Sequence, residues 1–301
     1  MNVNHQKNVV NSAFINSASL LLAALCWGVV WYPYRIMAQA GYGAVAASFY
    51  SYLTVLILVG MVCIRHWRGV FKLPLSIFWL ALAAGWTNLA YVLAVIDGEV
   101  MRVMLLFYLS PLWTLILAHF WLKEHIDKRG LTTMILSLMG AFIMLYDITG
   151  KASAWPLPRN TAEWFALTSG IGFAISNVIT RKSTHLTIRS KSFAVWSGVL
   201  LMSILAMPFA KETIPAPSFL TLNDGLVILI IAMSLIAATF LTQYGITQMP
   251  ANRASVLFLF ELVVAAVTSY FLAHETMDIN EWIGGSLIVA ASIFAAFNHD
   301  N

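Results

Sequence analysis

The chain has 301 residues, of which 60% are hydrophobic and only 10% are charged. A water-soluble domain carries about 25% charged residues, because polar groups must cover its surface. With a formal net charge of only +4, this composition excludes a soluble globular protein and predicts that most of the chain lies in lipid.

Apolar stretches of membrane-spanning length follow one another along the sequence. A helix that crosses about 30 Å of hydrocarbon needs roughly 20 apolar residues. Ten such stretches occur, at residues 17–38, 45–64, 75–96, 101–122, 130–147, 162–181, 192–210, 224–246, 253–273 and 281–298. The sequence therefore predicts an all-α polytopic membrane protein with ten transmembrane helices.

The polar segments between these stretches divide the chain into four regions. Residues 1–16 form a polar tail that we expect in the cytoplasm, and the loop at 149–161 contains Pro156 and Pro158. This loop separates a first five-helix repeat, residues 17–148, from a second one, residues 162–298.

The basic residues are concentrated on one side of the predicted membrane. If the N-terminus is cytoplasmic, most of the 17 Lys and Arg residues fall in cytoplasmic segments, as in the run from Arg181 to Lys191. Cytoplasmic loops of membrane proteins carry such an excess. We therefore expect both termini in the cytoplasm, at a bacterial inner membrane, and we attribute the positive charge to orientation and not to a nucleic-acid partner.

The two halves of the sequence resemble each other. A constant shift of 151 residues places Glu124 on Glu275 and Asp127 on Asp278, and a shift of 146 places Trp27 on Phe173 and Arg35 on Arg181. Because each half has five spans, the second must enter the membrane with opposite polarity. Related halves of inverted topology are typical of secondary transporters that work by alternating access.

Three segments resemble EamA-type transporters of the drug/metabolite transporter superfamily. They are LLFYLSPLWTLILAHFWLKEHIDKRGLTTMILSLMGAFI at Leu105–Ile143, FLAHETMDINEWIGGSLIVAASIFA at Phe271–Ala295, and LCWG at Leu25–Gly28, followed by Arg35. The resemblance implies ten helices with cytoplasmic termini around a central substrate cavity. It also implies transport, often export, of amino acids or similar small organic solutes.

Glu261 is the sharpest single signal for function. It lies about nine residues into the ninth predicted span, roughly 13 Å deep. The early Pro that the resemblance implies for this span is missing, because Leu262 aligns with Pro111, and Glu261 lies beside Leu262. A charged acid there costs about 2.5–3.5 kcal/mol, so it should face a wet cavity or a partner, or be protonated. Glu261 is therefore a candidate for proton coupling or for anchoring a cationic group. The structural alternative is a neutral acid hydrogen-bonded inside the bundle.

Other candidate site residues lie at a similar depth in the membrane to Glu261 or near the end of a span. The candidate pocket residues are Trp27, Asn88, Tyr91, Tyr108, Trp113, Asn177, Gln243 and Tyr244. The candidate gate or hinge residues are Pro33, Arg35, Arg102 and Pro111. Polar groups in lipid also join helices by hydrogen bonds, and aromatic rings also anchor at headgroups, so both alternatives stay open. We expect Glu124 to cap the helix that follows it, or to pair with Lys128 or nearby backbone amides.

These observations predict a secondary transporter, an exporter of small organic metabolites such as amino acids. The alternatives are a facilitator of another solute class, namely a cationic or aromatic compound, a cofactor or a nucleoside, and an intramembrane enzyme. No enzyme motif of the known intramembrane kinds occurs in the sequence. We expect a monomer or weak dimer in membrane lipid with protons as the candidate coupling ion, and we expect no bound cofactor or metal.

Overall fold

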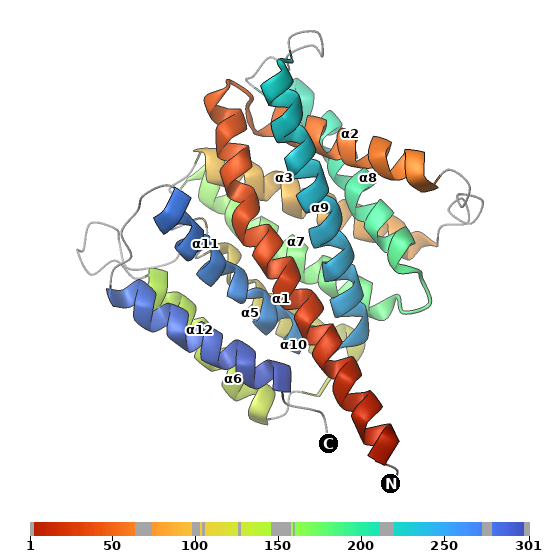
Figure 1. The fold of residues 1–301 in the computed structure, drawn as a ribbon, viewed down its shortest axis with the longest axis vertical. Coiled ribbons are helices and arrows are strands. Elements are labelled where there is room, and N and C mark those ends of the chain that lie inside the picture. Colours follow the sequence, from red (N-terminus) through yellow and green to blue (C-terminus); the bar gives the residue numbers. More distant parts are fainter. Residues whose placement is uncertain are drawn as a thin grey trace.

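The computed structural model describes residues 3–63, 74–97, 103, 106–125, 128–145, 158, 160–210, 220–272 and 279–297. Every regular element in these ranges is a helix (Figure 1). The prediction of an all-α polytopic protein with ten spans is confirmed, although two of the spans are each divided into shorter helices.

The first half contains α1 (Val3–Gln39), α2 (Ala44–Cys63), α3 (Leu75–Asp97), α5 (Ser110–Leu117) with the π-helical η2 (Ala118–Leu122), and α6 (Lys128–Leu145). The second half contains α7 (Thr161–Lys182), α8 (Ile188–Ala206) with η3 (Met207–Phe209), α9 (Leu222–Gln248), α10 (Ala251–Phe258), α11 (Phe260–Leu272) and α12 (Ile279–Phe297). Helix α1 begins inside the segment that we expected to be a polar tail, and its part from Phe14 to Gln39 is apolar enough to cross a membrane.

The outer surface of the bundle is apolar. Large side chains such as Phe120, Trp164 and Phe209 are 72%, 54% and 86% exposed. Soluble monomers rarely expose so many large apolar side chains. Among the described residues, five helices are long and apolar enough to span a membrane by themselves, and four shorter apolar helices accompany them. Helix α7, with 22 residues, is also of spanning length. The protein is therefore a multi-pass membrane protein.

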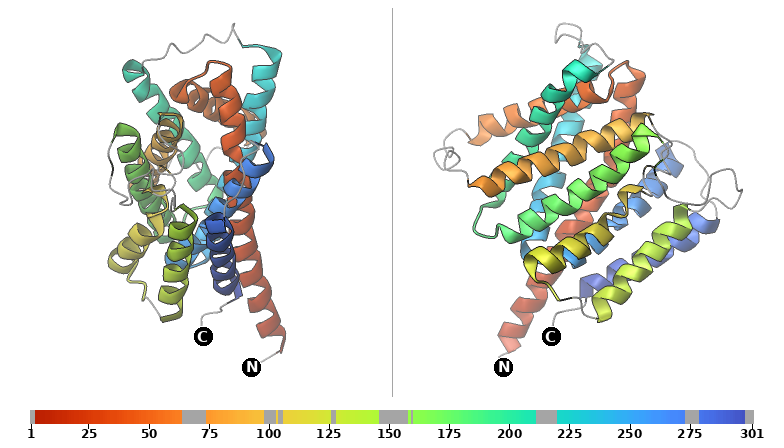
Figure 2. Two further views of the ribbon diagram at one scale, coloured as in Figure 1. Left: turned by 90° about the vertical axis from the view of Figure 1, so that its left-hand side faces the viewer. Right: turned by 180° about the vertical axis from the view of Figure 1, so that it is seen from behind.

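Most of the helices form two layers, and the repeat relation between the two halves maps each layer onto the other. The first layer holds α3, α5, α7 and α8, and the second holds α1, α2, α9, α10 and α11 (Figure 2). Helix α3 packs on α7 as α9 packs on α1, and α5 packs on α7 as α11 packs on α1. Each layer thus combines the first two helices of one half with the third and fourth spans of the other half, as two inverted repeats require.

Both ends of the chain lie at the same end of the bundle, which we call the terminal end (Figure 1). Helix α1 leads away from the terminal end, whereas α7, its counterpart in the second half, leads back towards it. Helices α6 and α12 pack on each other at the edge of the molecule. The opposite directions of α1 and α7 are the inverted topology that the odd number of spans predicted.

Candidate functional site

The fourth and ninth spans are interrupted at matching positions near the middle of the bundle. Tyr108 and Leu109 form a turn before α5, and Leu259 forms a turn between α10 and α11. The same shift of 151 residues relates the two turns. The amide N of Leu109 donates to Leu106 at 3.4 Å, and that of Leu259 donates to Val256 at 3.1 Å. Each span tightens at this turn, and the predicted ninth span at 253–273 consists of α10 and α11.

Proline does not account for both breaks. Pro111 lies in the first turn of α5, where its missing N–H costs nothing. Its counterpart Leu262 is an ordinary buried residue, yet the ninth span is still divided. Pro33, the other hinge candidate, lies inside α1, which continues on both sides of it.

Glu261 occupies the first turn of α11, directly after the break. The N-terminus of a helix carries partial positive charge that favours a carboxylate there. Tyr91 in α3 and Tyr108 at the other break pack in one hydrophobic cluster with Leu259 and Leu262, which lie two residues before and one residue after Glu261. Three residues that the sequence singled out separately therefore come together, with Glu261 on the second layer and both tyrosines on the first.

Aromatic rings connect the two layers around this acid. The ring centroids of Phe107 lie 5.1 Å from Tyr91 and 5.7 Å from Phe173, and Phe173 lies 5.2 Å from Phe258. The hydroxyl of Tyr108 is buried and makes no hydrogen bond within the described ranges. Such surroundings suit a solute with an apolar or cationic part, because rings offer dispersion and cation–π contacts.

Helix α1 forms the adjoining wall through a close approach at Gly28. A Cβ built on Gly28 would lie 2.9 Å from the carbonyl oxygen of Glu261. The indole Nε1 of Trp31 donates to Thr268 Oγ1 at 3.1 Å, and that hydroxyl donates to the Gly28 carbonyl at 3.2 Å. Trp27, the preceding residue, donates from Nε1 to Thr242 Oγ1 at 3.2 Å. The Gly28 approach and the Thr268 hydrogen bonds fix α11, and with it the Glu261 backbone, against α1, whereas the Trp27 bond joins α1 to α9.

Two of the predicted polar candidates make hydrogen bonds between helices. Asn88 accepts from the Tyr52 hydroxyl at 2.8 Å and donates to the Ala84 carbonyl at 2.8 Å. Gln243 accepts from Thr180 Oγ1 at 3.0 Å. The amides of both residues therefore join helices in this structure.

The remaining candidates differ in their environments. Asn177 Nδ2 and Trp113 Nε1 are buried and have no hydrogen-bond partner in the part of the chain described. Tyr244 is half-buried in α9, and Arg35 is exposed near the end of α1. Arg102 lies outside the described residues.

Sequence reasoning missed the partners of Glu124. We expected this acid to cap its own following helix, or to pair with Lys128 or nearby backbone amides. Its carboxylate instead accepts from the backbone N of Ala251, at 3.1 and 3.3 Å, and lies 3.6 Å from Arg181 Nε. The acid at matching positions in the two halves was visible in the sequence, but the contact partner lies 127 residues away.

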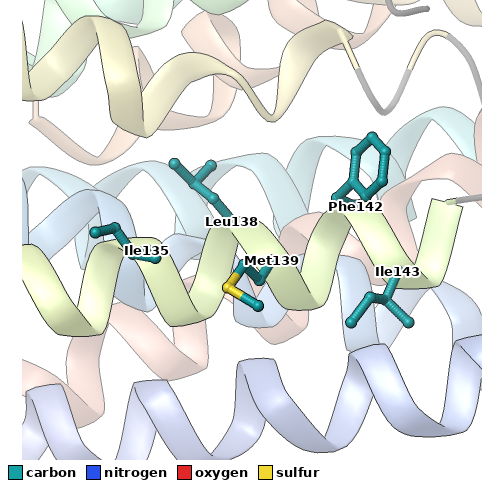
Figure 3. A pocket seen from close by; sticks show the side chains of 5 residues that line it. All are labelled: Ile135, Leu138, Met139, Phe142 and Ile143. Carbon is teal, nitrogen blue, oxygen red and sulfur yellow. The ribbon is translucent and has the colours of Figure 1, made fainter.

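A pocket on the outer face of α6 is not suited to a polar solute. It encloses about 340 Å³ and is lined by Ile135, Leu138, Met139, Phe142 and Ile143 (Figure 3). All five side chains are apolar and come from one helix, and the pocket is open to the surroundings of the bundle. Lipid chains match such a surface.

The inverted repeats, the paired breaks and the polar groups between the layers define the class of a membrane transporter for small solutes. The chain matches the model of the EamA-like transporter family over residues 17–146 and 160–297, and it belongs to this family. The resemblance seen in the sequence is confirmed.

The similar proteins are named as transporters. One, from Archaeoglobus fulgidus, is called an uncharacterized transporter and is 24% identical over 92% of this chain and 95% of its own. Another, from Rickettsia bellii, is called an S-adenosylmethionine uptake transporter and is 24% identical over 73% of this chain and 70% of its own. A solved structure titled "Crystal structure of protein" has the same fold, with a TM-score of 0.72 and 14% identity over 93% of this chain and 95% of that one.

Proposed function

We propose that this chain is a secondary transporter that moves a small organic solute with a cationic group, such as an amino acid, by alternating access between the two layers. Glu261 holds the cationic group, and the rings of Tyr91 and Tyr108 contact the rest of the solute. The observation that carries the proposal is the packing of both tyrosines against Leu259 and Leu262, the residues beside Glu261, where the two interrupted spans meet.

The breaks explain why a solute can bind at this depth. Irregular backbone inside a membrane is tolerated only where it is buried in protein or lines a wet cavity. Discontinuous helices whose ends point at the bound group recur in secondary transporters. A carboxylate in such a place can exchange a cationic solute for a proton, because both neutralise the same charge. Protons are therefore the proposed coupling ion.

The relatives support a solute of this kind. S-Adenosylmethionine, the solute in the name of the Rickettsia relative, combines an amino-acid ammonium group, a sulfonium cation and an aromatic base. An acid among aromatic rings complements each of these parts. For the direction of transport we keep the prediction of export made from the sequence, although the Rickettsia relative is named for uptake.

Transport into proteoliposomes with an imposed pH gradient tests the proposal. The panel contains radiolabelled amino acids, S-adenosylmethionine and a nucleoside, and reversing the gradient separates export from uptake. We expect Glu261→Gln to abolish or uncouple transport without loss of folding. The matched control is Glu163→Gln, since Glu163 is also a buried acid in the first turn of a helix, where its backbone N donates to the N-cap residue Asn160. Coupled transport at the wild-type rate by the Glu261 variant would remove Glu261 from the mechanism.

The orientation belongs to the same proposal. We place the terminal end in the cytoplasm of a bacterial inner membrane because the excess of Lys and Arg falls in the loops on that side.

A further inference from the structure

At the terminal end, a charged cluster joins the two layers. Glu124, which follows η2 in the first layer, accepts from the Ala251 amide N at the start of α10 in the second layer. Arg181, at the end of α7, lies 3.6 Å from the same carboxylate and donates from Nη1 to the Thr247 carbonyl of α9 at 2.8 Å. The Glu124–Ala251 and Arg181–Thr247 hydrogen bonds cross from one layer to the other, whereas the Arg181–Glu124 pair lies within the first layer.

A buried lysine extends this cluster. The side chain of Lys191, in α8, is fully buried. Its Nζ donates to the Thr180 carbonyl at 2.8 Å and to Thr247 Oγ1 at 2.9 Å. Thr180 in turn donates to Gln243 of the second layer. Arg181, Lys191 and Thr180 of the first layer therefore all donate hydrogen bonds to the last turns of α9.

Each charge in the cluster matches the helix end that it contacts. The first amides of a helix have no partner within the helix and attract anions, and the last carbonyls attract cations. Glu124 meets the start of α10, whereas Arg181 and Lys191 meet carbonyl groups in the last turns of α7 and α9. The hydrogen bonds from one layer to the other form only while the two layers are in contact at this end.

The backbone conformation at the end of the fourth span directs Glu124 towards the second layer. The fourth span ends in the π-helical turn η2, and Lys123 follows with a φ of 55°, the left-handed conformation. This conformation is costly for a residue with a side chain, and such strain collects at sites where the direction of the chain matters. It ends the helix sharply and turns the next residue, Glu124, towards Ala251.

We propose that Glu124, Arg181 and Lys191 close the transport pathway at the terminal end, and that these contacts break when the pathway opens there. The inference rests on the proposed alternating access of the two layers. It assigns a positioning role to three residues that do not touch the solute site. A bond at the opposite end offers a contrast, since Tyr42 donates to Asp224 at 3.2 Å entirely within the second layer. Burial raises the pKa of Tyr42, and the Asp224 hydrogen bond and charge add to this, so its phenol stays a donor.

Asn177 provides a reporter position behind the cluster. It is buried in α7, four residues after Phe173 of the aromatic rings and three before Thr180 of the cluster. Residues at this spacing share one face of a helix. A cysteine at position 177 is therefore shielded from the terminal end only while the closure holds.

The experiment measures modification of Asn177→Cys by a membrane-impermeant thiol reagent added from the terminal side, in a chain carrying Cys26→Ser and Cys63→Ser. We expect Glu124→Ala to raise the rate roughly tenfold, the effect of losing a charged hydrogen bond, and Glu124→Gln to raise it less. Tyr42→Phe, the control, should leave the rate unchanged.

An unchanged rate in folded Glu124→Ala and Glu124→Gln proteins would overturn the closure, with folding checked by thermal unfolding in detergent. The labelling needs no solute, so its outcome is separate from that of the transport assay. Faster labelling in Glu124→Ala, together with normal transport by Glu261→Gln, would support the closure and reject the proposed solute site.

Discussion

Gly28→Ala is the smallest change that should disturb the proposed solute site. The added Cβ would lie 2.7 Å from Val264 Cβ and 2.9 Å from the Glu261 carbonyl oxygen. Carbon atoms pack best at about 3.5–4.0 Å, so α1 and α11 must separate by about 1 Å. Overpacking of this kind costs about 1–3 kcal/mol.

The separation should also impair transport. The Trp31 and Thr268 hydrogen bonds that hold α1 against α11 would lengthen, and Glu261 would move relative to Tyr91 and Tyr108. A misplacement of about 1 Å can lower the rate of a reaction on the order of 100-fold in an enzyme site. A transporter also depends on the position of the groups that bind its solute. We therefore expect the initial rate of transport to fall by roughly 10- to 100-fold in the variant.

The matched control is Gly60→Ala, because a Cβ on Gly60 meets no atom within 4 Å in the described structure. An alanine within an exposed helix gains up to about 1 kcal/mol over glycine, so Gly60→Ala should keep or raise the thermal stability. Thermal unfolding in detergent and initial uptake rates in proteoliposomes measure both effects. If Gly28→Ala matches Gly60→Ala in both measurements, the close approach of α1 to Glu261 does not matter for function.

Three further predictions follow from particular contacts. Lys191→Met removes the Nζ donor to the Thr180 carbonyl and to Thr247 Oγ1, so it should destabilise the protein by about 1–3 kcal/mol. Lys182→Met, at an exposed position, should not, and equal unfolding temperatures of the two variants would contradict this. Trp27→Ala should weaken solute binding several-fold, since one aromatic contact contributes about 0.5–1.5 kcal/mol, and the lipid-facing Trp164→Ala should bind normally; equal affinities would remove Trp27 from the site. Epitope tags on the two termini should be digested together by protease from one side of the membrane, and digestion from opposite sides would refute the inverted repeats.

The main features of the fold were predictable from residue types and their order. Ten apolar stretches, an odd number in each half and the matching pairs Glu124–Glu275 and Trp27–Phe173 predict inverted repeats. Lipid imposes this regularity, because each backbone group in the membrane must be satisfied within its own helix. The sequence also drew attention to Glu261, because acids are scarce in such a composition.

The candidate site was predictable only in part. Tyr91, Tyr108 and Glu261 were each selected by type and depth, and the structure brings them together. Asn88 and Gln243 were selected by the same reasoning, yet their amides bond to neighbouring helices. Depth along a helix does not reveal which direction a side chain faces, and the sequence contains no strong amphipathic pattern to settle it, since both lipid and core are apolar.

The sequence by itself determined that the chain crosses a membrane many times as two related halves, because hydrophobic length and charge placement act locally. Only the tertiary structure decided that the ninth span breaks beside Glu261 without a proline, and that Glu124 reaches the amide of Ala251 in the other half. Both outcomes depend on contacts between residues far apart in the chain. Such contacts are set by the packing of the two layers, which no single segment specifies.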